Sequence, residues 1–394
     1  MMSSMTADDT RKAAREALLA ELTQIPTAAG LEDRVIAFVD AWIGARTDRV
    51  HAERDDAGNI LVWQRRRPTG IAPILFTAHL DHPAFVVTGV ASDGTVALEF
   101  RGGVNDPYFE GAALELIGPG DARAHATILS LDAAAKPFKT VTAHMSSAGI
   151  PAWLSAGCIA RWQFPRAELV DGCIHTDACD DLAAAAAALA AFDELLDAPA
   201  CGHVGLLLTV AEEVGFLGTI HAARHGFVPR DARLLCLENS RSFPHDSPIG
   251  AGAILRVGDR ISVFTPELTN RLAELYGDAA SKDPAFRWQR KLMPGGACEA
   301  TAFASYGYRS TCLCLPLGNY HNMVDIDGVA AGARPARVAR EFVSLADFHS
   351  LVEMLHLAAR GLDASPAETT GQLMERLYAE RGMVLKRRRI AATA

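Results

Sequence analysis

Residues 204–213 read VGLLLTVAEE, a short apolar run that ends in two adjacent carboxylates. An apolar run of this length is typical of a strand buried on both faces of a sheet. A Glu-Glu pair is ordinarily a solvated surface feature. Two charges directly after a buried strand are costly unless they bind something, so this position favours a functional pair.

Three further apolar runs lead into polar side chains: residues 71–77 before His79 and Asp81, residues 234–237 before Glu238, and residues 311–317 before His321. Stretches with helical spacing of Ala and Leu accompany them: residues 8–22, 31–43 and 181–196. Strands that alternate with helices predict an α/β fold, with a largely parallel sheet that is covered on both faces.

Residues 82–174 have a different composition. Val, Thr, Gly and Pro dominate there, helical spacing fades, and strand-like pieces recur at residues 95–100 and 126–131. This predicts a separate β-rich domain inserted into the α/β catalytic domain, which would comprise residues 1–81 and 175–394.

The polar residues at the ends of the apolar runs are candidate metal ligands. In open α/β sheets, bound molecules and ions lie beyond the carboxyl ends of the strands, and side chains at these strand ends converge there. Asp180, which opens the Ala-rich helix, is a further candidate, although Asp180-Asp181 also suits a plain helix N-cap. Imidazole with carboxylate favours zinc, with cobalt and manganese as alternatives. Two histidines and three carboxylates could hold two ions if one carboxylate bridges them, and a spare carboxylate would act as general base.

Composition narrows the classes of function. The chain has 394 residues, 49% hydrophobic and 22% charged, which is usual for a soluble protein. A net charge of −9 argues against nucleic acid or an anionic membrane as a partner. We expect a cytoplasmic protein, because the sequence has no signal-peptide core, no apolar stretch of about 18 residues, and eight cysteines without a CxxC pair.

The candidate residues occur in a characteristic order: His79-x-Asp81, Asp180-Asp181, Glu212-Glu213-Val214-Gly215, Glu238 and Tyr320-His321. This order resembles the co-catalytic zinc exopeptidases, and it is most similar to the glutamyl-aminopeptidase type that forms tetrahedral assemblies. The resemblance spans nearly the whole chain, and residues 212–218 carry its most specific match.

The resemblance implies a three-layer α/β/α domain with an inserted barrel-like domain that serves assembly or covers the site. It implies that His79 binds one metal ion and His321 the other, with Asp180 as the bridge and Glu213 and Glu238 completing the two shells. Glu212 would be the general base, and Asp81 would orient His79. Peptides or small amides would be the substrates, and the protein would be a homo-oligomer.

Two alternatives stay open. In the wider superfamily, Glu at the position of Glu238 is commoner among carboxypeptidases and N-acyl amino acid hydrolases than among aminopeptidases. A catalytically silent metal-binding scaffold is the alternative of another class, but it predicts the loss of Glu212 or of a ligand, and all six positions are intact. His321 in its Gly-Asn-Tyr-His loop could also be purely structural.

Overall fold

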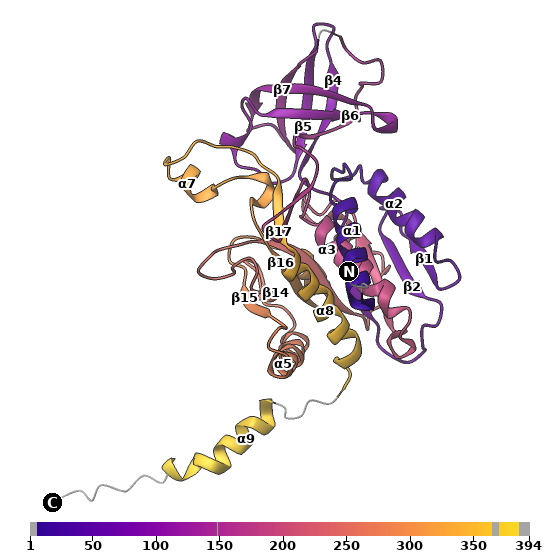
Figure 1. Cartoon of the computed structure of the whole chain (residues 1–394), viewed down its shortest axis with the longest axis vertical. Coiled ribbons are helices and arrows are strands. Elements are labelled where there is room, and N and C mark those ends of the chain that lie inside the picture. The colour runs from indigo at the N-terminus through magenta and orange to yellow at the C-terminus, as the bar shows by residue number, and fades with distance from the viewer. Residues whose placement is uncertain (1–5, 148, 365–369, 386–394) are drawn as a thin grey trace, which may run out of the picture.

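A computed structural model of the chain describes residues 6–147, 149–364 and 370–385. Within these ranges the chain folds into an α/β part that carries a β-barrel at one end (Figure 1). The predicted fold class is therefore confirmed. Residues 1–5, 365–369 and 386–394 of the predicted catalytic domain lie outside the described ranges.

The helices of the described residues are α1 (Ala7–Leu22), α2 (Asp33–Gly44), α3 (Leu182–Leu195), α4 (Leu217–Arg224), α5 (Pro266–Lys282), α6 (Glu299–Ser305), α7 (Ile326–Ala330), α8 (Leu345–Gly361) and α9 (Thr370–Arg381). The strands outside the barrel are β1 (Val50–Arg54), β2 (Ile60–Gln64), β3 (Ile74–His79), β10 (Glu168–Val170), β11 (Cys173–Thr176), β12 (Val204–Thr209), β13 (Arg233–Arg241), β14 (Ala253–Gly258), β15 (Trp288–Leu292), β16 (Arg309–Leu317) and β17 (Glu341–Ser344). None of the described helices is long and apolar enough to cross a membrane.

The larger sheet has the strand order β1-β2-β12-β3-β13-β16-β14-β15. Its centre is parallel, because β12 pairs with β3, β3 with β13, and β13 with β16 in the same direction. Antiparallel pairs extend it on both sides, between β1, β2 and β12 and between β16 and β14. Strands β10, β11 and β17 form a separate small sheet.

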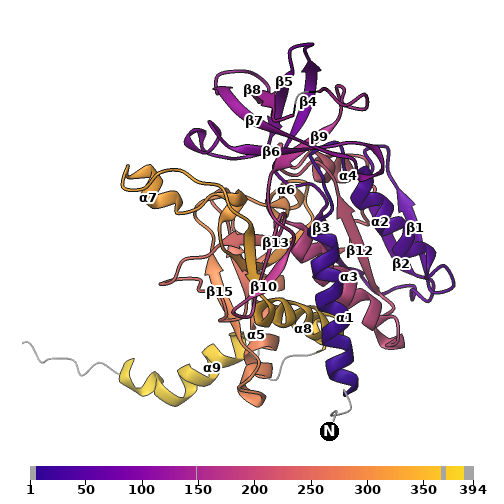
Figure 2. The same ribbon diagram turned by 45° about the horizontal axis from the view of Figure 1, so that its top comes forward.

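Both faces of the large sheet are covered. Leu206 and Leu208 of β12 pack into the core that includes α1, α3 and α8, whereas Leu207 between them packs into the core that includes α4 and α6. This alternation follows from the two-residue repeat of a strand. The result is the three-layer arrangement visible in Figure 2. Residues 183–188 of α3 are all alanines with 0% exposure, and side chains this small let the helix lie close to the sheet.

The inserted segment forms a closed barrel of β4 (Ala84–Val90), β5 (Thr95–Arg101), β8 (Lys139–Met145), β7 (Arg123–Asp132), β6 (Ala113–Ile117) and β9 (Ile159–Trp162), in that spatial order. Aromatic rings fill its interior, with centroids 4.8 Å apart between Phe85 and Phe100 and between Phe85 and Trp162. The chain enters the barrel after β3 and returns to the α/β part before α3, so both junctions lie close to the ends of the elements that carry the candidate ligands.

One strand is longer than the sequence predicts. The apolar run at residues 234–237 suggests a short strand that ends at Glu238, but β13 continues to Arg241. Its partner β16 pairs with it along the whole length, with Glu238 opposite Cys314. Glu238 therefore projects from within the ladder, where backbone hydrogen bonds fix its position more firmly than a loop would.

Candidate metal centre

Three neighbouring strands bring four predicted residues to one edge of the sheet. His79 is the last residue of β3, Glu212 and Glu213 follow β12, and Glu238 lies in β13. Strand β3 lies between the other two and runs parallel to both, with His79 opposite Thr209. The carboxyl ends of parallel strands meet at one edge, so these four side chains converge.

Asp180 and His321 come from connecting segments. Asp180 lies two residues before α3, and His321 lies in the 3-10 turn Tyr320–Asn322 after β16. His321 has a φ of 52°, a left-handed conformation that is uncommon for a residue with a side chain and is frequent at functional sites. A hydrogen bond of 2.8 Å from its backbone N–H to Oε1 of Glu341 holds the turn in place.

Asp180 lies between the two histidines. Its Oδ1 is 3.5 Å from Nε2 of His79, and its Oδ2 is 3.4 Å from Nε2 of His321. The same nitrogen of His321 is 3.4 Å from Oε1 of Glu213, and Nε2 of His79 is 3.8 Å from Oε2 of Glu212. Glu238 lies close to His79 and Asp180: one nitrogen or carboxylate oxygen from each of the three lies within 4.8 Å of the other two. One carboxylate thus faces two clusters of nitrogen and oxygen donors.

The hydrogen bonds of His321 orient its ring for a cation. Its Nδ1 donates to the carbonyl oxygen of Gly103 at 2.5 Å. A neutral ring therefore directs the lone pair of Nε2 toward the carboxylates of Asp180 and Glu213. Acceptors that face one another in this way repel unless a cation lies between them.

Burial and charge lead to the same conclusion. His79, Asp180 and Glu238 are buried, and Oδ1 of Asp180 and Oε1 of Glu238 have no hydrogen-bond partner. Among the described residues, no Lys or Arg forms an ion pair with Asp180, Glu212, Glu213 or Glu238; the two histidines pair with the first three of these. Buried carboxylates without compensating charge are costly, so this donor set fits divalent cations.

The buried carboxyls differ in acidity. Burial raises the pKa of Glu212, of Glu213 and of Glu238. Burial acts in the same direction on Asp180, but contacts with His321 and His79 outweigh it and lower the pKa of this carboxyl. Asp180 is therefore the carboxyl most firmly held as an anion, whereas burial favours the protonated form of the three glutamates.

Asp81 and Asp181 support the candidate ligands from behind. The two oxygens of Asp81 accept the backbone N–H groups of Glu212 and Glu213, each at 3.0 Å. Its Oδ1 also lies 3.3 Å from Nδ1 of His79, without the alignment of a hydrogen bond. Asp181 makes no side-chain cap on α3 and instead accepts the backbone N–H of His79 at 3.3 Å. Asp181 thus occupies the N-cap position of α3 without the side-chain hydrogen bond of a helix cap.

Two supporting residues escaped the sequence reasoning. Glu341 is fully buried and accepts the backbone N–H groups of Cys179, Asp180 and His321 at 2.7, 3.0 and 2.8 Å. Glu32 accepts the N–H of Ala211 at 2.9 Å, directly before Glu212. No sequence motif includes Glu341. Glu32 lies just after the loop at residues 25–30, and this position is the one feature of the sequence that could have indicated its role.

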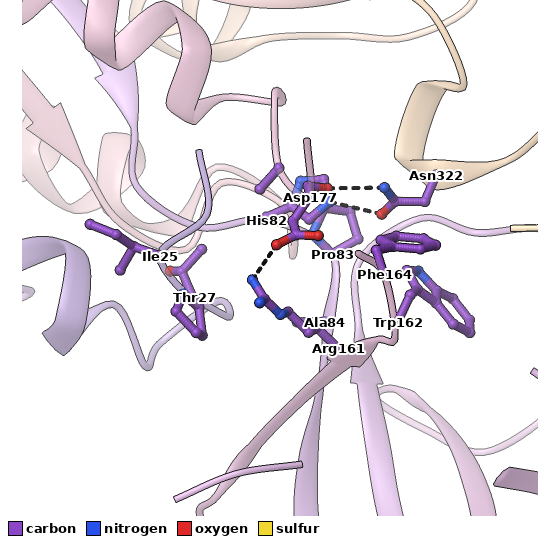
Figure 3. A pocket seen from close by; sticks show the side chains of 12 residues that line it. Ile25, Thr27, His82, Pro83, Ala84, Arg161, Trp162, Phe164, Asp177 and Asn322 are labelled. Carbon is purple, nitrogen blue, oxygen red and sulfur yellow. Dashed lines mark hydrogen bonds and ion pairs between the residues drawn. The ribbon is translucent and has the colours of Figure 1, made fainter. Parts of the chain in front are cut away.

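A small cavity lies beside His82 and Asp177 (Figure 3). Its volume of about 20 Å³ is room for roughly one water molecule, so it is no substrate site. His82 forms part of its wall, with Nδ1 against the carbonyl oxygen of Asp180 and Nε2 3.1 Å from Oδ1 of Asn322. Asp177 pairs with Arg161 of the barrel at 2.6 Å across the same wall. These contacts connect the loop before α3 to the barrel.

Comparisons with known proteins bear on the fold and on the family of this chain. The TET1 peptidase of Pyrococcus horikoshii is 20% identical, with a TM-score of 0.66 over 88% of this chain and 99% of that chain. A TET aminopeptidase from a marine-sediment archaeon of the Thaumarchaeota is 18% identical, with a TM-score of 0.71 over 89% and 98%. An aminopeptidase of the archaeon Desulfurococcus kamchatkensis is 18% identical, with a TM-score of 0.69 over 90% and 96%. These structures share the fold, and no curated protein matches the sequence.

The family comparison goes further than the shared fold. The model of the M42 glutamyl aminopeptidases matches residues 58–334, which is more than half of the chain and includes every candidate ligand. The carboxypeptidase and N-acyl hydrolase alternatives receive no such support. The chain therefore belongs to the M42 glutamyl aminopeptidase family, whose members are metal-dependent hydrolases that remove N-terminal residues from peptides.

Proposed function

We propose that this aminopeptidase uses two divalent metal ions, zinc by preference, held by His79, Asp180, Glu213, Glu238 and His321. The observation that carries the proposal is the position of Asp180, whose two oxygens face one histidine each in a buried group of carboxylates. Nitrogen and carboxylate donors suit zinc, and cobalt or manganese could replace it. When bound, such a pair of ions polarises the scissile carbonyl and acidifies water.

Glu212 is the base in this proposal. Its carboxylate faces the centre, 3.8 Å from Nε2 of His79, and it would take a proton from the attacking water and pass it to the leaving amine. Its backbone is fixed on both sides, because Asp81 accepts its own N–H and Glu32 accepts the N–H of Ala211. A carboxylate held this firmly keeps its position as the proton moves.

Assembly and location form the remaining part of the proposal. The P. horikoshii TET1 peptidase assembles into a tetrahedron or a larger octahedral shell, and we propose a homo-oligomer for this chain as well. All eight cysteines are free, which suits the reducing cytoplasm. Light scattering on the purified protein tests the assembly, and a monomer at all concentrations would contradict it.

A mixed pool of short peptides, half with free and half with acylated N-termini, tests the function. After incubation with metal-loaded protein, mass spectrometry should show stepwise loss of residues from free N-termini only. Exhaustive chelation should abolish this loss, and added zinc, cobalt or manganese should restore it. Trimming from the C-terminus, release of acyl groups, or full activity after chelation would each contradict the proposal.

A further inference from the structure

A second cavity, of about 430 Å³, lies where the barrel meets the α/β part. Four separate segments line it: residues 103–105 after β5, residues 241 and 243 at and after the end of β13, residues 293–296 after β15, and residues 320, 323 and 326 after β16. This volume lies within the usual range of small-ligand sites.

The cavity adjoins the metal centre on two sides. Gly103, in its wall, accepts the hydrogen bond from Nδ1 of His321, and the ring of Tyr320 stacks on that of His321 with centroids 3.9 Å apart. On the other side, Oγ of Ser240, two residues after Glu238, lies 3.5 Å from Sδ of Met293. A peptide whose first carbonyl is at the metal centre can therefore extend its first side chain into this cavity.

The lining is apolar. Its larger side chains are Val104, Phe243, Met293, Tyr320, Met323 and Ile326. Val104 and Met323 are 3% and 4% exposed, so they form a wall rather than a rim. Burial of an apolar substrate side chain against such walls is favourable, whereas burial of a carboxylate there requires a cation to pair with it.

Arg241 is the one charged residue among those that line the cavity, and its charge is already matched. Its Nη1 and Nη2 bond the two oxygens of Asp327 at 3.1 and 2.5 Å. Its guanidinium also lies over the ring of Phe243, 4.7 Å from the centroid. A substrate carboxylate would have to displace Asp327 to reach it.

We infer that the enzyme prefers peptides whose N-terminal side chain is apolar, such as Leu, Met or Phe, and discriminates against Glu, because Asp327 neutralises Arg241, the one cation among the described residues that line the cavity. The inference rests on the proposed function of the adjoining centre. The inferred preference for apolar N-terminal residues differs from the preference for N-terminal glutamate that the family name suggests.

Turnover gives the first test. Metal-loaded protein should cleave Leu-Ala-Ala and Phe-Ala-Ala with kcat/KM on the order of 100-fold above Glu-Ala-Ala. Asp327→Asn leaves Arg241 without its partner and should raise the Glu-to-Leu ratio of kcat/KM about tenfold. The control is Asp278→Asn, which breaks the exposed pair with Lys282 on α5, outside the residues that line the cavity, and should leave the ratio unchanged. Preference for Glu by the wild type, or an unchanged ratio in Asp327→Asn, would overturn the inference.

Binding gives a test that does not depend on turnover. Calorimetric titration of metal-loaded protein with the reaction products L-leucine and L-glutamate should show tighter binding of leucine. Asp327→Asn should reduce the difference in affinity between the two amino acids. If no peptide is cleaved but leucine still binds more tightly, the proposed function fails and the cavity assignment stands. If peptides are cleaved while glutamate binds as well as leucine, the function stands and the cavity assignment is wrong.

Discussion

Replacement of Glu341 by Gln tests how the centre is assembled. The carboxylate of Glu341 is fully buried and accepts three backbone N–H groups, with Oε2 bonded to Cys179 and Asp180 and Oε1 bonded to His321. It therefore joins the segment of the bridging carboxylate to the segment of the second histidine. A glutamine has one oxygen and one NH2 group, so at least one of these N–H donors must lose its acceptor and face a donor instead.

The magnitude follows from these three contacts. A hydrogen bond to a charged group contributes about 1.5–3 kcal/mol, and a buried donor left without an acceptor costs about 1–3 kcal/mol. Glu341→Gln should therefore lower the free energy of unfolding by about 2–4 kcal/mol in the metal-free protein. Because the ligand segments lose their common anchor, metal affinity should also fall by about 10- to 100-fold, the usual effect of residues that orient ligands.

The assay pairs urea denaturation with competition against a chelating dye. Asp347→Asn is the matched control, because Asp347 is also fully buried and accepts the backbone N–H groups of Gly250 and Gly252, each at 2.6 Å, away from the centre. It should lower the stability by a similar amount and leave metal affinity within twofold. If Glu341→Gln loses stability but binds metal like the wild type, Glu341 is only a structural residue and the reasoning fails.

Three further results are expected. Glu212→Gln should keep its metal and lose about 100- to 10,000-fold in kcat, measured with a peptide substrate, whereas full activity would exclude its role as base. Glu32→Gln should remove the pH dependence of a buried carboxyl: burial and the nearby Asp81 raise the pKa of Glu32 to about 7, so the native wild type binds this proton more tightly than the unfolded state. The stability of the metal-free wild type should therefore fall, relative to Glu32→Gln, by about 2–3 kcal/mol between pH 5 and pH 8 in urea titrations, and parallel curves would contradict this. Phe85→Ala, which empties the aromatic core of the barrel, should cost about 3–5 kcal/mol with unchanged metal affinity by dye competition.

Local sequence patterns predicted the strands and several candidate ligands. Residues 204–210 and 74–77 are apolar and buried, which requires a sheet covered on both faces, and the residues after them lie at its edge; the strand expected over 71–77 begins only at Ile74, because Ile71 is exposed. The structure brings together His79, Asp180 and Glu213, together with Glu238 and His321, and their roles as ligands stay predictions until metal is measured. Asp180 and His321 were the harder cases, because both lie in connecting segments.

The supporting residues could not be predicted in the same way. Glu341 and Glu32 act by accepting backbone N–H groups of residues far away in the sequence, and such partners are set only when the tertiary structure forms. The extension of β13 past Glu238 depends on its pairing with β16. The apolar cavity is built from four separated segments, so no single stretch of sequence carries its signature.

The number of metal ions bound per chain tests the central claim most directly. Protein dialysed against zinc and then against metal-free buffer should contain two zinc ions per chain, measured by elemental mass spectrometry. His321→Ala should retain one, and Asp180→Ala should lose both, because each oxygen of Asp180 faces a different histidine. A wild type that holds no metal, or an Asp180→Ala variant that still holds two ions, would contradict the account.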